Sequence, residues 1–252
     1  MARIIINGDD LGMNRGCTLA IARAFEEGLI TDTTMMANGS YFDEAVRLAK
    51  RQGFHERIGI HFNLTEGTPL TKGILAIADF VRDGRFHKGF SATPRSLSEE
   101  EREAVYRELY AQARRLTDAG LRITHADSHH YIHHLIPLAP ITAAVCRRFG
   151  IDRMRRNRTF DTPEHPILTE NRVDHGYWQE NGFITPMYFG RRADFVNMPI
   201  PDGTEVIVHP DFDQKGRLID RTGMQEGYPT GEPLDFISGR KDVSLICYDE
   251  LD

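Results

Sequence analysis

The sequence has few of the features that would indicate a secreted, disulfide-bonded or membrane-bound protein. Its only cysteines are Cys17, Cys146 and Cys247, which lie far apart and lack the spacing of metal ligands. We expect reduced, mostly buried thiols, as is usual in the cytoplasm. No apolar run reaches the length of a membrane span, and the short N-terminal run has no signal-peptide cleavage site after it. The sequence therefore favours a cytoplasmic location without a membrane partner.

The sequence also lacks the positive charge that is typical of nucleic-acid-binding proteins. Its 252 residues carry a formal net charge of −6, so we expect no nucleic-acid partner. The one basic cluster, Arg153 to Arg158, is interpreted as a solvated or ion-paired face, although one arginine in it can orient a carboxylate or a sugar hydroxyl. There is no Walker-type phosphate loop, nucleophile elbow or dinucleotide fingerprint.

Short apolar runs typical of strands alternate with helical patterns along the chain. Predicted strands include residues 3–7, 33–36, 58–62, 121–126, 206–208 and 243–248, and the clearest helices are 16–27 and 99–118. This alternation predicts an α/β fold with a mainly parallel sheet. Residues 67–90 are expected to form a long loop, and residues 159–193 show no clear period. Because no repeat or linker is present, we predict one domain, residues 1–252.

Polar side chains follow several predicted strands, at the end where α/β barrels hold their active sites. Asp9 and Asp10 come directly after the first strand, and a bend at Gly8 or Gly12 can aim both into one cleft. Two such close carboxylates need a cation to stay ionised together. The alternative is that Asp10 only caps the next helix.

Histidines are concentrated in the segment 125–134, which holds five of the eleven in the chain. Histidine is a common ligand of transition metals, and Asp127 can hold such a ring from the outer shell. A solvated histidine-rich loop is the alternative. His61 and His209 are weak candidates alone and gain weight because each lies at the carboxyl end of a predicted strand, His61 within strand 58–62 and His209 directly after strand 206–208.

These segments together resemble a known family. The runs Asn7–Gly12, Gly59–Gly67 and Thr124–His130 are similar to motifs of the YdjC-like carbohydrate deacetylases, which include the chitooligosaccharide deacetylases. The likeness returns at Val208–Pro210 and Leu245–Leu251. Two departures stand out: Tyr131 replaces a histidine that is frequent in the family, and residues 159–203 and 220–241 match little. We expect the substrate-selecting loops in those two segments.

The resemblance implies a distorted TIM-like (β/α) barrel and hydrolysis of the N-acetyl group of a sugar or short oligosaccharide. It implies one divalent cation held by Asp10, His61 and His125, with Asp9 as catalytic base and His209 as general acid. It further implies magnesium and a homodimer. Two imidazole ligands instead favour zinc or another transition metal, because magnesium prefers oxygen.

Two other classes of function remain open from the sequence. A metal-dependent phosphoester hydrolase would use the same ligands and cationic groups near the phosphoryl group, for which the Arg153 to Arg158 cluster is the only candidate. A non-catalytic sugar-binding or metal-binding protein would need no base beside the ligand carboxylate, so the pair Asp9 and Asp10 argues against it.

Overall fold

A computed structural model of the chain describes residues 1–161, 167, 169–195 and 198–252. Part of the aperiodic segment 159–193 therefore lies outside the described residues. The main strands are β1 Ala2–Leu11, β2 Asp32–Met35, β3 Ile58–Phe62, β6 Ala126–Ser128, β7 Tyr188–Arg191, β8 Thr204–Val208 and β12 Val243–Leu245. The helices are α1 Arg15–Glu26, α2 Phe42–Gln52, α3 Gly89–Ala92, α4 Glu99–Asp118, α5 Ala139–Arg148 and α6 Tyr177–Glu180.

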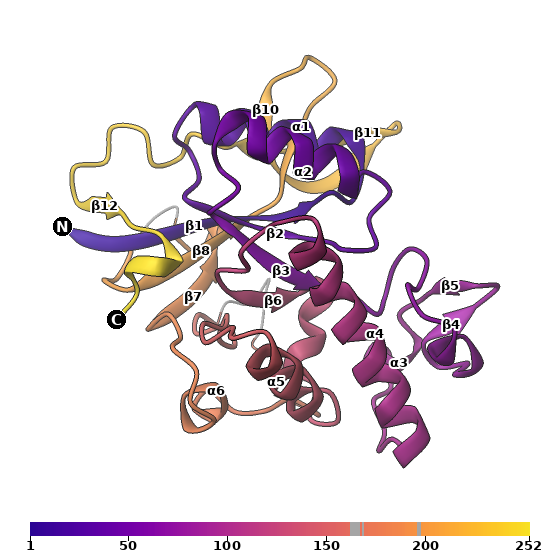
Figure 1. Cartoon of the computed structure of the whole chain (residues 1–252). Coiled ribbons are helices and arrows are strands. Elements are labelled where there is room, and N and C mark those ends of the chain that lie inside the picture. The colour runs from indigo at the N-terminus through magenta and orange to yellow at the C-terminus, as the bar shows by residue number, and fades with distance from the viewer. Residues whose placement is uncertain (162–166, 168, 196–197) are drawn as a thin grey trace.

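These strands form one curled parallel sheet in the order β6-β3-β2-β1-β8-β7, and β12 pairs with the first residues of β1. Parallel bridges from Ala126 to Met154 and from Arg153 to Ile184 continue the sheet past β6. Figure 1 shows α1 and α2 on one side of the strands and α4 and α5 on the other. The architecture is the predicted α/β fold, a distorted TIM-like barrel with a mainly parallel sheet.

The inside and the outside of the barrel differ in chemistry because successive strand residues point to opposite faces. On β1, Ile4 and Ile6 join the apolar core packed outside the sheet, whereas Asn7 and Asp9 share the inner face and hydrogen-bond to each other. The inner face is therefore buried and polar, a condition that requires every charge there to be paired.

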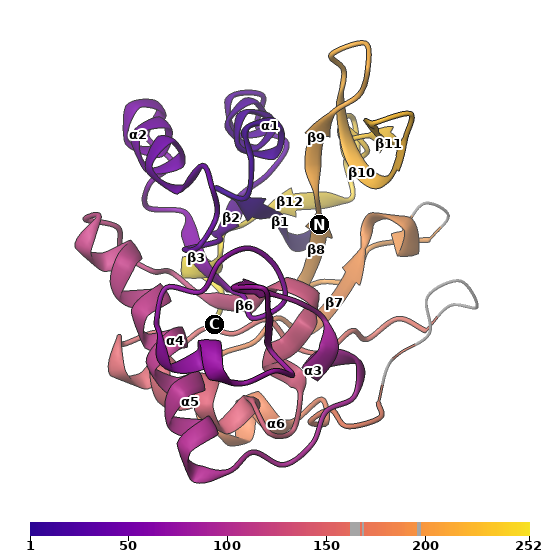
Figure 2. The same cartoon turned by 90° about the vertical axis from the view of Figure 1, so that its right-hand side faces the viewer.

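Within the described ranges, two smaller sheets and four short 3-10 segments are added to the barrel. The small strands are β4 Val81–Arg82, β5 Arg85–Phe86, β9 Pro210–Phe212, β10 Leu218–Gln225 and β11 Tyr228–Pro233. The 3-10 segments are η1 Gly73–Ala76, η2 His129–His134, η3 Arg192–Phe195 and η4 Tyr248–Glu250. The expected loop 67–90 thus holds short regular elements of its own. The antiparallel sheet of β9, β10 and β11 stands beside α1 (Figure 2). Across the described part of the chain, no helix has both the length and the apolar character needed to cross a membrane.

The position of β6 differs from the sequence-based expectation. We predicted a strand over residues 121–126, but the strand is Ala126–Ser128, and the segment before it is irregular. The apolar residues Leu121 and Ile123 suggested a strand, and Leu121 is in fact buried in the apolar core that surrounds the sheet. This shift moves the carboxyl end of the strand from Ala126 to Ser128, so that His129 and not His125 lies next to that end.

We predict that Gly59→Ala lowers the free energy of unfolding by about 1–3 kcal/mol, the usual cost of overpacking. A methyl group on Gly59 would lie 2.6 Å from Cε1 of the buried His125 ring. That ring is stacked on Tyr248 with 3.7 Å between ring centroids, so it has no room to retreat. Gly73→Ala is the control, because its new Cβ would meet nothing closer than Ala104 Cβ at 3.8 Å. Equal denaturation midpoints for the two variants would contradict this packing.

Candidate metal centre

A β-bulge brings two adjacent aspartates to the same side of the sheet. The register between β1 and β2 shifts between Gly8 and Leu11, and Asp10 has a left-handed backbone with φ 73°. Asp9 points inward by strand alternation, and the bulge turns Asp10 to the same side. His61 Nε2 consequently lies 3.4 Å from Asp10 Oδ1 and 4.0 Å from Asp9 Oδ2.

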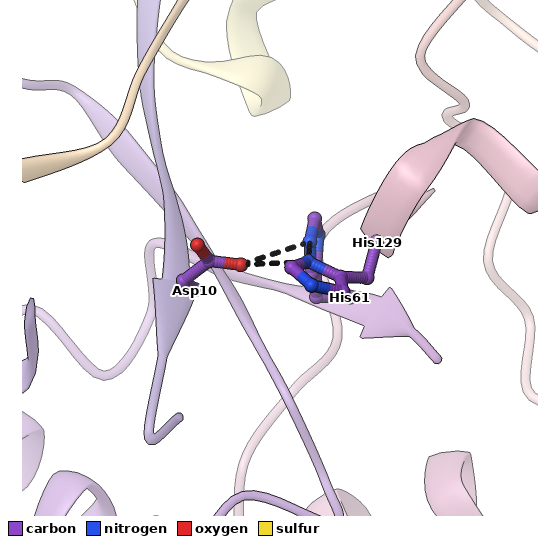
Figure 3. A group of neighbouring side chains, drawn as sticks. All are labelled: Asp10, His61 and His129. Atoms are coloured by element: carbon purple, nitrogen blue, oxygen red, sulfur yellow. Dashed lines mark hydrogen bonds and ion pairs between the residues drawn. The ribbon is translucent and has the colours of Figure 1, made fainter. Parts of the chain in front are cut away.

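Asp10, His61 and His129 direct one ligand atom each toward a common point (Figure 3). His129 Nδ1 is 3.0 Å from Asp10 Oδ1 and 3.3 Å from His61 Nε2. Asp10 Oδ1 is buried and accepts no well-oriented hydrogen bond, although both rings face it. An oxygen left in this way between two imidazole nitrogens fits a divalent cation.

Carboxylates hold the far sides of both histidine rings, as is usual for ligands of a metal. His61 Nδ1 lies 2.6 Å from Asp127 Oδ1, which leaves Nε2 facing Asp10. Burial lowers the pKa of His61, but the carboxylates of Asp127 and Asp9 outweigh it and raise the pKa to about 10. His129 Nε2 lies 3.2 Å from Oε2 of Glu66.

A second set of possible ligands, Asp9, His61 and Asp127, shares His61 with the first. Arg155 already binds both of its carboxylates, with 2.8 Å to each oxygen of Asp9 and 2.5 Å to Asp127 Oδ2. A cation there would be repelled by the guanidinium. The first set is therefore the better metal site.

Asp9 is held as an ionised group at the edge of this centre. Asn7 donates a 2.8 Å hydrogen bond to Asp9 Oδ1, in addition to the two bonds from Arg155. Burial alone would raise the pKa of Asp9, but the charges of Arg155 and His61 overcome it and lower the pKa to about 2. Asp9 is thus a fixed, negatively charged hydrogen-bond acceptor at neutral pH.

Arg155 is a completely buried arginine in the middle of the barrel. Besides Asp9 and Asp127 it binds Glu205 Oε1, 2.7 Å from its Nη2, and its guanidinium lies over the Phe189 ring. The Arg153 to Arg158 cluster therefore contains the arginine that orients a carboxylate, an option that the sequence left open.

The structure does not bring His125 to Asp10 and His61. His125 lies before β6, and its Nε2 is 3.1 Å from Asn7 Oδ1 while its Nδ1 is 2.8 Å from Thr124 Oγ1. Burial and the charge of Arg155 hold the pKa of His125 well below its usual range. With both nitrogens engaged inside the barrel, His125 is not available at the cluster, where His129 stands instead.

His209 follows β8 and is partly buried. Its backbone N–H donates to Asp220 Oδ1 at 2.8 Å. Val208 pairs with Gly8 in the parallel register of β8 and β1, so His209 and Asp9 follow paired residues of two neighbouring strands.

Sequence reasoning missed three residues of the site. His129 directly follows β6, and the strand-end rule would have selected it if the strand had been located correctly. Arg155 could be recognised only as one of several arginines in the basic cluster, any of which can orient a carboxylate. Arg221, which lies 3.0 Å from Asp10 Oδ2, follows no predicted strand and no motif.

Tyr131 and His130 lie on the segment that follows β6. Both have left-handed backbones, with φ 56°, which is strained for residues other than glycine. His130 Nδ1 lies 2.8 Å from Thr65 Oγ1. Burial raises the pKa of Tyr131, whose side chain is within reach of the charges of Arg191, Arg155 and Asp9.

The fold and the site together define an α/β-barrel protein with a candidate metal centre at the carboxyl ends of its strands. The profile of the YdjC-like protein family matches residues 3–232, and the chain belongs to this family. A carbohydrate deacetylase of Listeria welshimeri serovar 6b is 37% identical over 254 residues, covering 99% of this chain and 100% of the relative. One of Brevibacillus brevis is 32% identical over 264 residues, covering 99% of each chain. The crystal structure of a candidate cellobiose-phosphate cleavage protein from Enterococcus faecalis shares the fold, with a TM-score of 0.72, 22% identity and coverage of 99% of this chain and 98% of that one.

We predict that Arg155→Met lowers the free energy of unfolding by roughly 3–5 kcal/mol at pH 8, the usual effect of breaking a buried ion pair. The loss should shrink at pH 5. Without the guanidinium, burial raises the pKa values of Asp9 and Glu205, and an acid with a raised pKa destabilises the fold only while ionised. In the wild type the sign is opposite: the lowered pKa of Asp9 stabilises the fold above pH 3.8, and this contribution is lost as pH falls toward about 2.

Melting temperatures of the metal-free proteins at both pH values test this prediction. Arg240→Met is the control, because Arg240 pairs with the exposed Asp242. A surface pair contributes little at either pH. If Arg155→Met and Arg240→Met melt alike at pH 8, Arg155 is not needed to neutralise the barrel interior.

Proposed function

We propose that this protein hydrolyses the N-acetyl group of acetylated sugars or short oligosaccharides of the chitooligosaccharide type and releases acetate. The observation that carries the proposal is the ionised Asp9 directly beside the cluster of Asp10, His61 and His129. The names of the full-length relatives support the same activity.

In this proposal Asp10, His61 and His129 hold one divalent cation. When bound, it would polarise the acetamide carbonyl and lower the pKa of a water molecule. The chain's own contribution is to keep three donor atoms converged and buried. These ligands come from β1, β3 and the segment after β6, so the centre lies at the carboxyl ends of the strands, where α/β barrels hold their active sites.

Asp9 is proposed as the general base. Arg155 and Asn7 fix both the ionised state and the orientation of its carboxylate, which removes the cost of orienting it during the reaction. A carboxylate with so low a pKa accepts a proton efficiently only from an acidified water. His209 is proposed as the general acid that protonates the departing amine, since it follows Val208, which pairs with Gly8 directly before Asp9, and its backbone N–H is held by Asp220.

The phosphoester alternative has less support than it had from the sequence. It needs free cationic groups near the reacting centre. Arg153 pairs with Asp152, Arg155 with three carboxylates and Arg158 with Asp194, while Arg156 donates to backbone carbonyls. The basic cluster is thus engaged within the protein.

The proposal includes three further expectations about the whole molecule. The chain acts as one domain over residues 1–252, it forms a homodimer as the family resemblance implies, and it works in the cytoplasm. The three cysteines are free and buried, which is consistent with a reducing compartment. Light scattering of the purified protein tests the dimer.

We predict that Asp9→Asn lowers kcat for acetate release from N,N′-diacetylchitobiose by about 10²–10⁴-fold, the usual contribution of a general base. Its metal content, measured by elemental analysis, should remain that of the wild type. Asp83→Asn is the matched control on an exposed turn and should keep full activity. Equal rates in wild type and Asp9→Asn would remove Asp9 from the mechanism.

We also predict that zinc, manganese, cobalt or nickel restores more activity to the metal-free protein than magnesium does. One carboxylate and two imidazoles form a donor set that suits transition metals, whereas magnesium prefers oxygen ligands. The measurement is acetate release after chelation and addition of each ion alone. Full recovery with magnesium and none with the others would refute this assignment.

A further inference from the structure

Arg221 is a second arginine that binds an aspartate of the candidate metal centre. It lies on β10, outside the barrel sheet, and its side chain is 20% exposed. One nitrogen, Nη2, is 3.0 Å from Asp10 Oδ2, and the other, Nη1, is 3.3 Å from Asp211 Oδ2. Arg221 therefore contacts the oxygen of Asp10 that does not face the histidines.

The backbone around Arg221 is fixed to the chain that follows β8. The N–H of Arg221 donates to the carbonyl oxygen of His209 at 2.9 Å, and the N–H of His209 donates to the Asp220 side chain. The pairing of β10 with β9 adds further hydrogen bonds. The backbone of Arg221 is therefore held by hydrogen bonds, and its guanidinium is held by Asp10 and Asp211.

We propose that Arg221 is a positioning residue for the metal ligand Asp10. It occupies Oδ2, so that only Oδ1 is presented to the point shared with His61 and His129. Asp10 needs such a partner because its backbone is left-handed and Oδ1 itself accepts no well-oriented hydrogen bond. The inference rests on the proposed metal site, and it concerns how that site is shaped, not which bond is hydrolysed.

Two effects of Arg221 on metal affinity oppose each other. Its positive charge repels a cation, so removing it would by Coulomb energy alone strengthen binding. The two guanidinium nitrogens that bind Asp10 and Asp211 fix the Asp10 carboxylate. Loss of a residue that holds a metal ligand in this way typically weakens metal binding by about 10–100-fold. The proposal requires the second effect to be larger, because an unrestrained Asp10 can rotate or offer both oxygens.

The test is a titration of the metal-free protein with cobalt(II), followed by the visible absorption of the bound ion. Arg221→Met should bind cobalt about 10–100-fold more weakly than wild type and with an altered spectrum, since the carboxylate geometry changes. Arg221→Lys keeps a cation but not the fork that reaches both Asp10 and Asp211. Arg221→Lys should also alter the cobalt spectrum. Because the positive charge is kept in this variant, such a change would be due to the geometry of the Asp10 carboxylate and not to the loss of charge.

Arg217→Met is the matched control. Arg217 lies between β9 and β10, and its pair with Asp213 is away from the centre. It should leave both the affinity and the spectrum of cobalt unchanged. Circular dichroism of each metal-free variant establishes whether it is folded. If Arg221→Met is unfolded, the cobalt titration of Arg221→Lys decides the test.

Three outcomes would overturn the inference. Unchanged affinity and spectrum in both Arg221 variants, or tighter binding in Arg221→Met, would make the contact an ion pair without a positioning role. Wild-type protein that binds no cobalt would overturn the metal centre and this inference together. Because the readout is metal binding, loss of deacetylation on a particular sugar leaves the inference intact and affects only the proposed function.

Discussion

The buried guanidinium of Arg155 is the interaction on which the rest of the barrel interior depends. Asp9, Asp127 and Glu205 come from three different strands, and each contacts this one side chain. Without it, three carboxylates buried away from water would repel one another with no cation to offset their charge. The arginine joins β1, β6 and β8 electrostatically and keeps Asp9 ionised, so the same contact organises both the fold and the candidate metal centre.

Much of the fold follows from the sequence because the apolar residues outside the barrel repeat with the period of the strands and helices. Asp10 and His61 could be selected because each follows or ends a strand with clear alternation. His129 could not be selected from the sequence, because the irregular apolar segment before β6 resembles a strand, and this places the predicted end of the strand at Ala126 and not at Ser128. His125 and His129 are both in the motif, and only the true strand boundary separates them.

Other contacts gave no local signal at all. Arg221 is 211 residues away from Asp10 along the chain, on a hairpin whose sequence matches no motif. An ion pair of that kind depends on where a whole sheet is placed beside the barrel, and this placement is decided by packing against α1. Arg155 was visible only as one of several basic residues, since burial is a property of the folded chain.

The bulge in β1 has a consequence for moving this centre to another protein. A regular strand sends neighbouring residues to opposite faces, so copying Asp9 and Asp10 into an ordinary barrel would bury one of them among the outer helices. The extra residue and the left-handed Asp10 are what bring both to one side. A designer would have to transplant the backbone irregularity first and the two side chains second, and the spacing between the proposed base and the proposed ligand would then be copied with the backbone.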